Sequence, residues 1–357
     1  MSAPSDPRPL DSPPAPPPPK PRWRRLRKLL RISAWLYLAF ALALWIFLRI
    51  AADRWWLGTV LLFGPLWLAL VPLIGVLPVA LLFRDRRSIL VLVATTAVIV
   101  VPVMDLCIPW RTVLNGRADP AHLRLRVLTC NIHRKQLTPA ALADLIAAAN
   151  PDVIALQAWT SQFQTTILET GKWHSIRDDE LFLVSRYPIR KVLDIAAGNW
   201  ARERVTGSAI VYEISTPHGP VPLVNLHLVS PHRSFDSVLG RDGDAPATLS
   251  NHLALRLSQS QLVAQAAQDR GGASMLLAGD FNTPVDSEIF RKSWSPACAD
   301  AFTTAGWGFG YTYYVRRTST RIDHVLFGAD WTCRKCWVGP PVGSPHRPLI
   351  ADLEWNR

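Results

Sequence analysis

The sequence predicts an α/β protein of two packed mixed sheets flanked by helices, preceded by three transmembrane helices. Two observations predict this class. Three long apolar stretches without charge lie before residue 108, and from residue 123 onward short strand-like runs alternate with turn signals. Strands dominate this second part, and the few helical patterns fall between groups of strands. Two sheets covered by helices are therefore expected rather than a regular βαβ series.

The N-terminal segment is rich in proline and then in basic residues. Its first 21 residues contain ten prolines, and seven Lys and Arg follow between Lys20 and Arg31. Such a composition cannot bury enough apolar surface to fold, so residues 1–31 are predicted to form a disordered tail. A polyproline ligand for a partner domain is the alternative.

The uncharged stretches cover residues 33–48, 55–83 and 88–104. Stretches of this length usually span a bilayer, so residues 32–108 are predicted to form a membrane domain of three helices, with 109–122 as a linker. The alternative is a helical hairpin buried in a soluble protein. The lipid bilayer is therefore a predicted partner, and no obligate protein partner is indicated.

Basic residues predict the orientation in the membrane. The block ending at Arg31 and the loop containing Arg84, Arg86 and Arg87 are both expected in the cytoplasm, where such residues concentrate. Three spans then predict a multi-pass protein of the plasma or inner membrane, with a cytoplasmic N-terminus and an extracytoplasmic C-terminal domain. If the second stretch, rich in Pro and Gly, were re-entrant, that domain would lie in the cytoplasm.

The charge of the two parts differs. The formal net charge of +12 divides into +8 for residues 1–107 and +4 for residues 108–357. The basic character therefore belongs mainly to the N-terminal third, and it gives little support for a nucleic-acid-binding groove in the second domain.

The second domain is expected to cover residues 123–357. One helix begins at Thr138 as N-cap, with Pro139 at the first helical position, and another follows Ser250 to about residue 267. His218 and Gly219 predict a hairpin turn. Strands are expected at 123–131, 153–157, 180–185, 206–215, 221–229, 275–280, 320–327 and 347–355.

The cysteines indicate no zinc site. Cys333 and Cys336 form a C-x-x-C pair, but no further pair with comparable spacing lies near it. A disulfide between them is conceivable in an oxidising compartment, although a strand at this position would resist so tight a bridge.

Polar residues lie at or near the ends of several strands. Some of them could have a purely structural role, such as an Asx-turn for Asp280 and Asn282 or an ion pair between Asp323 and Arg321. Together these residues offer acids, bases and amide donors suited to an anionic, oxygen-rich substrate. They are Asn131, Asn225, His227, Asp280, Asn282, Asp323 and His346.

The ordered motifs resemble those of the endonuclease/exonuclease/phosphatase superfamily, which includes deoxyribonuclease I. The motifs are LTCNIH, PDVIALQ, LVSRYPI, VNLHL, LAGDFNTP, RIDHVL and GSPHRPLIADL, in this order over residues 124–354. The resemblance implies a four-layer α/β sandwich and hydrolysis of phosphoesters with Mg²⁺ or Mn²⁺.

The resemblance also implies roles for individual residues. His346 matches the catalytic histidine, Asp323 the carboxylate that orients it, and Asp280 the residue that orients the water. His227 matches the histidine that holds a phosphate oxygen or protonates the leaving group. Asn131, Asn282 and Asn225 are expected to bind phosphate, and Asn131 and Asp280 to bind the metal.

Two matching positions depart from the pattern. Ala158 stands where the resemblance implies the principal glutamate ligand of the metal, and Pro345 stands where it implies an aspartate. Neither side chain offers an oxygen to a hard cation. Acids at 178–180 or Glu203 could substitute, but a solvated acidic turn is the favoured interpretation.

Two functions therefore remain open. One is a membrane-anchored phosphoesterase acting on a lipid head group, nucleic acid or small molecule. The other is a catalytically impaired pseudoenzyme that binds a phosphorylated ligand or partner. A transporter is not favoured, because the apolar stretches contain no internal acid or base.

Overall fold

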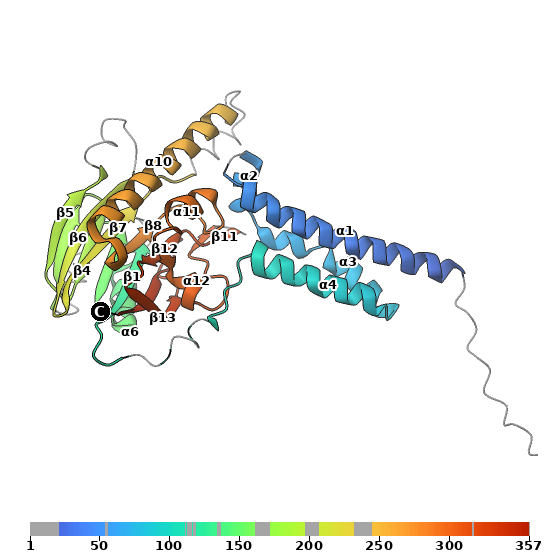
Figure 1. The fold of residues 1–357 in the computed structure, drawn as a ribbon, viewed down its shortest axis with the longest axis horizontal. Helices are drawn as coiled ribbons and strands as arrows, with labels where there is room; N and C mark the ends of the chain where they lie inside the picture. The colour runs from blue at the N-terminus through green and yellow to red at the C-terminus, as the bar shows by residue number, and fades with distance from the viewer. Residues whose placement is uncertain are drawn as a thin grey trace, which may run out of the picture.

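The computed structural model describes residues 21–53, 56–110, 112, 116, 119–133, 137–160, 172–196, 207–231, 245–315 and 318–356. A helical bundle projects from a sandwich of two sheets (Figure 1). The Pro-rich segment 1–20 and the candidate acid Glu203 lie outside the described residues.

The bundle begins earlier than the sequence predicts. Residues 21–31, expected to belong to the disordered tail, form the first turns of a long helix. The reason is that Leu30 is buried against the bundle and no helix breaker separates it from the apolar stretch. The bundle elements are α1 (Pro21–Ala51), α2 (Trp56–Leu62), η1 (Leu66–Leu70), α3 (Leu73–Leu82), α4 (Arg86–Val98) and the π-helical η2 (Ile99–Val103).

The prediction of three transmembrane helices is wrong. Among the described residues, two helices are long and apolar enough to cross a membrane, Trp23–Ala51 and Arg86–Val103. The middle stretch is divided into α2, η1 and α3, because prolines at 65 and 72 lack the N–H that a continuous helix needs. Its longest apolar helical part, Leu66–Leu82, is shorter than the two candidate membrane spans.

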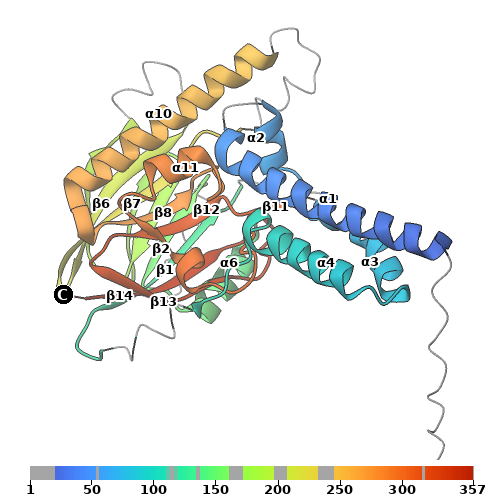
Figure 2. The same cartoon turned by 45° about the vertical axis from the view of Figure 1, so that its right-hand side comes forward.

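The two long helices run in the same direction. At the end far from the sandwich, Arg31 pairs with Asp85 at 2.7 Å, which joins the N-terminal part of α1 to the start of α4. At the near end, Arg49 of α1 contacts Asp286 at 3.4 Å, and Cys107 pairs with Gly308 just after η2. The intervening chain therefore returns along the bundle, as the turned view shows (Figure 2).

The sandwich contains two mixed sheets of six strands. Parallel pairing joins β1 to β2 and β7 to β8, and the other strand pairs are antiparallel. The first sheet has the order β13 (Trp331–Val338), β14 (Leu349–Trp355), β1 (Arg124–Asn131), β2 (Val153–Gln157), β4 (Leu181–Ser185), β3 (His174–Asp178). The second has the order β5 (Ile189–Asp194), β6 (Ser208–Thr216), β7 (Gly219–His227), β8 (Leu276–Asp280), β12 (Asp323–Phe327), β9 (Ala299–Asp300). A separate hairpin pairs β10 (Tyr313–Val315) with β11 (Thr318–Thr320).

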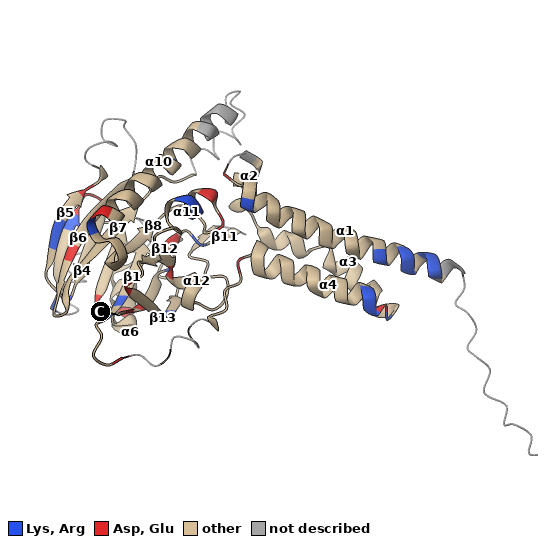
Figure 3. Ribbon diagram, in the orientation of Figure 1, with Lys and Arg blue, Asp and Glu red and all other residues tan. Residues whose placement is uncertain are grey.

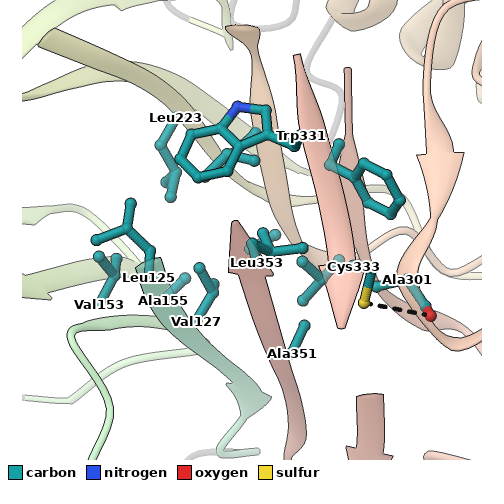
Figure 4. Packing of buried hydrophobic residues seen from close by; sticks show 14 of the residues in the cluster. Leu125, Val127, Val153, Ala155, Leu223, Ala301, Trp331, Cys333, Ala351 and Leu353 are labelled. Carbon is teal, nitrogen blue, oxygen red and sulfur yellow. Dashed lines mark hydrogen bonds between the residues drawn. The ribbon is translucent and has the colours of Figure 1, made fainter. Parts of the chain in front are cut away.

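Helices cover the outer faces of both sheets. One apolar cluster lies between the sheets, where Val127 and Val153 of the first sheet share a core with Leu223 of the second (Figure 4). A second cluster packs α6 (Pro139–Ala149) on the first sheet. A third packs α10 (Ala245–Gly271) and α11 (Glu288–Ser293) on the second sheet. The predicted α/β sandwich of two mixed sheets flanked by helices is confirmed.

Several local predictions are also confirmed. The Thr138 side chain accepts a hydrogen bond from Ala141 N–H, with Pro139 following as the first helical residue. The strands β6 and β7 form an antiparallel hairpin that turns before Gly219, whose φ of 118° favours glycine. Cys333 and Cys336 are free and buried in β13, which has an irregularity in its pairing after Cys333.

Polar contacts fix the bundle on the sandwich. Asp53, just after α1, accepts hydrogen bonds from the Ser287 hydroxyl at 2.6 Å and the Ile289 N–H at 3.2 Å. Arg321, which is buried just before β12, forms ion pairs with Asp105 and, at 3.6 Å, with Asp300, the last residue of β9 and the N-cap of α12 (Ala301–Ala305). The alternative prediction of an ion pair between Asp323 and Arg321 is therefore wrong, because Arg321 pairs with Asp105 and Asp300.

Candidate active site

His346, just before β14, packs against Asp323 at the start of β12. Its Nδ1 lies 2.8 Å from Asp323 Oδ2, and both side chains are buried. The segment around it is clamped from two sides, since Ser344 Oγ donates to Asn131 O at 2.7 Å and the Tyr314 N–H donates to Pro345 O at 2.9 Å. Pro345 and Pro348 restrict the backbone on the two sides of His346, and together with these contacts they place the imidazole opposite a fixed carboxylate.

This pair raises the pKa of His346. Burial by itself lowers the pKa of the imidazole, but the carboxylates of Asp323 and Asp280 outweigh burial and raise the pKa to about 9. His346 is therefore a cation at neutral pH in the metal-free protein. The ion pair stabilises the folded site below the ordinary pKa of 6.5, and this contribution is lost as the pH rises through about 9.

Asp280 lies at the centre of the site. It ends β8, where the preceding Gly279 is required because a Cβ there would lie 2.0 Å from Leu226 O. Its Oδ1 accepts the Asn282 N–H at 2.9 Å, which is the predicted Asx-turn, and its Oδ2 accepts the Asn131 amide at 2.9 Å. The pKa of Asp280 is raised, because burial and the neighbouring Asp323 outweigh the lowering effect of the nearby imidazoles and the Asn131 amide.

Two imidazoles face the same oxygen of Asp280. His346 Nε2 lies 3.8 Å and His227 Nε2 lies 3.6 Å from Asp280 Oδ2. The strand register explains this convergence, since Asp280 pairs with Asp323 across β8 and β12 and with His227 across β7 and β8. The sandwich thus collects side chains from the ends of four strands around one carboxylate.

Glu180 enters the site from the turn between β3 and β4. Its Oε1 lies 3.2 Å from His227 Nδ1 and accepts the Ser208 hydroxyl at 3.3 Å. Burial lowers the pKa of His227, but Glu180 and Asp280 outweigh it and the pKa is raised. The favoured prediction of a solvated acidic turn is therefore wrong for Glu180, because its side chain contacts His227 and Ser208.

Glu180 also lies beside Ala158, the position of the implied glutamate. The Trp159 N–H donates to the Glu180 carbonyl at 2.9 Å, and Ala158 has a left-handed φ of 53°. A carboxylate is therefore present near this place, although it comes from another strand connection and contacts His227. Sequence spacing gave no sign of it.

The asparagines have different positions. Asn131 lies in the site, with its amide nitrogen 3.4 Å from His227 Nε2. Asn282 donates its amide to Leu228 O at 2.8 Å and so braces the turn after β8. The structure does not bring Asn225 to the site: its amide bridges the two sheets, accepting from Gln157 at 2.8 Å and donating to Leu156 O. The phosphate-binding prediction for Asn225 is wrong, because this position lies inside the sandwich rather than at its edge.

A family model described as the endonuclease/exonuclease/phosphatase family matches residues 128–346. The chain belongs to this family. The match spans every residue of the site described above, from Asn131 in β1 to His346 before β14. Members of the endonuclease/exonuclease/phosphatase family are generally hydrolases, and a metal-dependent phosphoesterase or nuclease activity is what the family suggests.

Several solved structures match the chain at low sequence identity. An endonuclease/exonuclease/phosphatase from Beutenbergia cavernae shares 16% identity, covering 65% of this chain and 72% of that chain, with a TM-score of 0.48. A family protein from Bacteroides thetaiotaomicron shares 13%, covering 66% and 99%, with a TM-score of 0.49. Truncated Caenorhabditis elegans TDP2 shares 16%, covering 65% and 98%, with a TM-score of 0.47. No curated protein matches the chain.

The site contains donors for a divalent cation. Among the described residues, one ligand atom each from Asp280, Asp323 and His346 lies within 4.8 Å of the others, and all three are buried. Carboxylates with an imidazole suit Mn²⁺ at least as well as Mg²⁺, which prefers oxygen ligands. The set differs from the predicted Asn131 and Asp280, because Asn131 Oδ1 accepts the His133 N–H at 3.0 Å. Ala158 and Pro345 offer no side-chain donor.

The raised pKa of His346 can be measured. In the metal-free full-length protein with EDTA, carbon-labelled histidine should give an NMR signal that titrates near pH 9 and disappears in His346→Gln. In Asp323→Asn this signal should titrate at lower pH, because the largest charge that stabilises the imidazolium is removed. A His346 signal that titrates near 6.5 in the wild type would contradict the geometry.

Glu180 can be tested through His227. Glu180→Gln should lower kcat/KM for a phosphodiester by about tenfold or more, because the carboxylate that orients and charges His227 is lost. Asp179→Asn is the matched control, since Asp179 is an exposed acid in the same turn and has a φ of 51° that asparagine tolerates. Equal activity of the two variants would exclude a role for Glu180 in the reaction.

Proposed function

We propose that this chain is a membrane-anchored phosphoesterase that hydrolyses phosphodiester or phosphomonoester bonds with a divalent cation. The observation that carries the proposal is the buried Asp280 carboxylate lying between two imidazoles, each of which has its own carboxylate at Nδ1. Phosphoester hydrolysis needs a proton acceptor for water, positive charge for the phosphoryl oxygens and a proton donor for the leaving oxygen. These side chains provide each of the three.

Asp280 is the proposed proton acceptor. Burial raises its pKa toward the operating pH, which makes the carboxylate a better base than an exposed aspartate. Its Oδ1 is fixed by the Asn282 N–H, so Oδ2 is the oxygen presented to a water molecule. Asn131 donates to the same Oδ2 and restrains its direction.

The two imidazoles are the proposed cationic groups. His346 has a pKa of about 9, so its charge is available to a phosphoryl oxygen at neutral pH, with Asp323 fixing the ring. His227 is partly exposed and has a raised pKa, which suits a donor that protonates the leaving oxygen. A divalent cation held by Asp280, Asp323 and a deprotonated His346 would supply Lewis acidity in place of the imidazolium charge.

The apolar surface of the bundle supports membrane anchoring. Large apolar side chains project outward along α1, α3 and α4, including Leu36 at 65% exposure, Ile74 at 76% and Leu90 at 69%. Apolar surfaces of this extent on a soluble protein would mark an interface, and along parallel helices they match a bilayer core. The small residues Ala34 and Ala41 lie fully buried inside the bundle.

The distribution of charge supports the predicted orientation. Basic residues gather at the ends of α1 and α4 that lie far from the sandwich (Figure 3). Because cytoplasmic ends carry the excess of Lys and Arg, these ends are proposed to be cytoplasmic. The parallel course of α1 and α4 then supports an extracytoplasmic catalytic domain in a plasma or inner membrane. Lipid head groups, nucleic acid and small molecules are the proposed substrate classes.

A second candidate is a pseudoenzyme that binds a phosphorylated ligand or partner. The observation that favours it is the lack of oxygen donors at Ala158 and Pro345, where the family resemblance implies metal ligands. The retained cations and amides would still bind a phosphate group without hydrolysing it.

Hydrolysis of bis-p-nitrophenyl phosphate by the full chain in detergent distinguishes the two candidates. With Mn²⁺ or Mg²⁺ the wild type should turn over substrate, and EDTA should reduce the rate. His346→Ala should lower kcat/KM by about 100-fold or more, because the fixed cation is lost. Activity that appears only in the double variant Ala158→Glu with Pro345→Asp would establish the pseudoenzyme instead.

Topology can be tested in cells independently of activity. A C-terminal alkaline phosphatase fusion should be active and the matching β-galactosidase fusion inactive, because α1 and α4 both run from the proposed cytoplasmic ends toward the sandwich. Moving the same reporters to residue 85 should reverse the pattern, since this loop belongs with the cytoplasmic ends. An inactive phosphatase at the C-terminus, with stable fusion protein present, would refute the extracytoplasmic placement.

A further inference from the structure

A basic and aromatic pocket lies on the sandwich beside the point where the bundle ends. It has a volume of about 540 Å³ and is lined by Lys335 and Arg347 together with Trp307, Tyr314 and Trp337. Its lining contains no aspartate or glutamate among the described residues. None of the proposed catalytic side chains lines it, so it is a separate feature from the active site.

Two cations of the pocket rest on aromatic rings rather than on acids. The Arg347 guanidinium lies 4.1 Å from the centre of the Tyr314 ring, and the Lys335 ammonium lies 4.8 Å from that of Trp337. Within the described part of the chain, no carboxylate lies within ion-pair distance of either group. Arg334, by contrast, is neutralised by Glu354 at 3.0 Å. The pocket therefore presents positive charge that no carboxylate of the described residues balances.

The pocket adjoins the end of the second candidate span. That span ends at Val103, and Pro109 and Thr112 of the following segment line the pocket. The same segment is bound to the sandwich, because Cys107 and Gly308 exchange two backbone hydrogen bonds of 2.9 and 3.0 Å. The pocket is thus placed at the height where a bilayer surrounding the bundle would meet water.

Exposed tryptophans mark the same level. Trp307, next to Gly308, is 73% exposed, and Trp110, next to Pro109, is 58% exposed. Indole rings concentrate at the boundary between acyl chains and water, where one edge is apolar and the other can donate a hydrogen bond. Two exposed indoles on either side of one backbone bridge are costly in water and suited to this boundary.

We propose that this pocket binds the head group of an anionic phospholipid from the surrounding bilayer. Lys335 and Arg347 neutralise the phosphate, and the aromatic walls contact the glycerol and upper acyl region. The proposal rests on the membrane anchoring proposed above and is independent of hydrolysis. A bilayer lipid is favoured over a soluble anion because Pro109 and Thr112, which follow the second candidate span, line the pocket, as does the exposed Trp307, and Trp110 is adjacent to Pro109.

The test uses the full chain in neutral detergent, with thermal unfolding followed by fluorescence. Phosphatidylglycerol should raise Tm in a saturable manner, whereas phosphatidylcholine with the same acyl chains should raise it less. In Lys335→Gln with Arg347→Gln, the apparent Kd for phosphatidylglycerol should rise by about tenfold or more, since each basic side chain contributes separately.

The matched control removes two cations elsewhere. Arg190 in β5 and Arg270 at the end of α10 are exposed, and β5 lies on the side of the sandwich away from the bundle (Figure 1). Arg190→Gln with Arg270→Gln should leave the phosphatidylglycerol titration unchanged. If the pocket variant does not unfold cooperatively, Lys335→Gln alone carries the test, because Lys335 is exposed on β13.

Three results would overturn the proposal. They are equal effects of the two lipids, equal losses in the pocket and control variants, or a Tm rise with inorganic phosphate that matches phosphatidylglycerol. The last result would identify a soluble anion as the occupant. Because the readout is binding, a chain that hydrolyses no phosphoester still tests the pocket, and a failed lipid titration leaves the proposed catalysis untouched.

Discussion

The burial of one carboxylate, Asp280, is the constraint on which the site depends. A buried charge is tolerated only when hydrogen bonds and opposite charges replace water. Here that requirement is met by the amide of Asn131, the N–H of Asn282 and two imidazoles. Moving any of these groups would leave the carboxylate unsatisfied. The strand ends that carry them are therefore held together by electrostatics as well as by the core between the sheets.

The arrangement of the two imidazoles has a consequence for the departures at Ala158 and Pro345. In this chain, positive charge near Asp280 comes from protein side chains that are themselves paired with Asp323 and Glu180. Such charge is fixed by the fold and does not depend on ligand concentration. A cation ligated by His346 would replace the proton of that imidazole, whereas the charge of His227 would remain. The lack of oxygen donors at Ala158 and Pro345 would weaken retention of the cation more than this remaining charge.

Much of the fold and site could be predicted from sequence, for local reasons. Strand pattern, turn residues and the caps of the Thr138 helix depend on neighbours in the chain, and polar residues after buried strands converge because strand ends share an edge. The contact of Glu180 with His227 and the depth of Asn225 could not be predicted. Both depend on tertiary contacts, of Glu180 with Ser208 and His227 and of Asn225 with Gln157 and Leu156 in the other sheet. The division of residues 55–83 into shorter helices is also missed when the prediction relies on the apolar content of this stretch and not on the prolines that interrupt the helix.

The attachment of the bundle to the sandwich fixes the position of the candidate site relative to the bundle. Asp53 on Ser287, Arg321 on Asp105 and the pairing of Cys107 with Gly308 bind the two parts at separate points. A domain on a flexible linker changes its height and orientation relative to the bundle. A domain attached at several points keeps one height and one orientation. In a bilayer, the molecules that reach the site would then be those that diffuse laterally at that height above the membrane. The height of the site would therefore limit which molecules it meets, before any chemical recognition takes place.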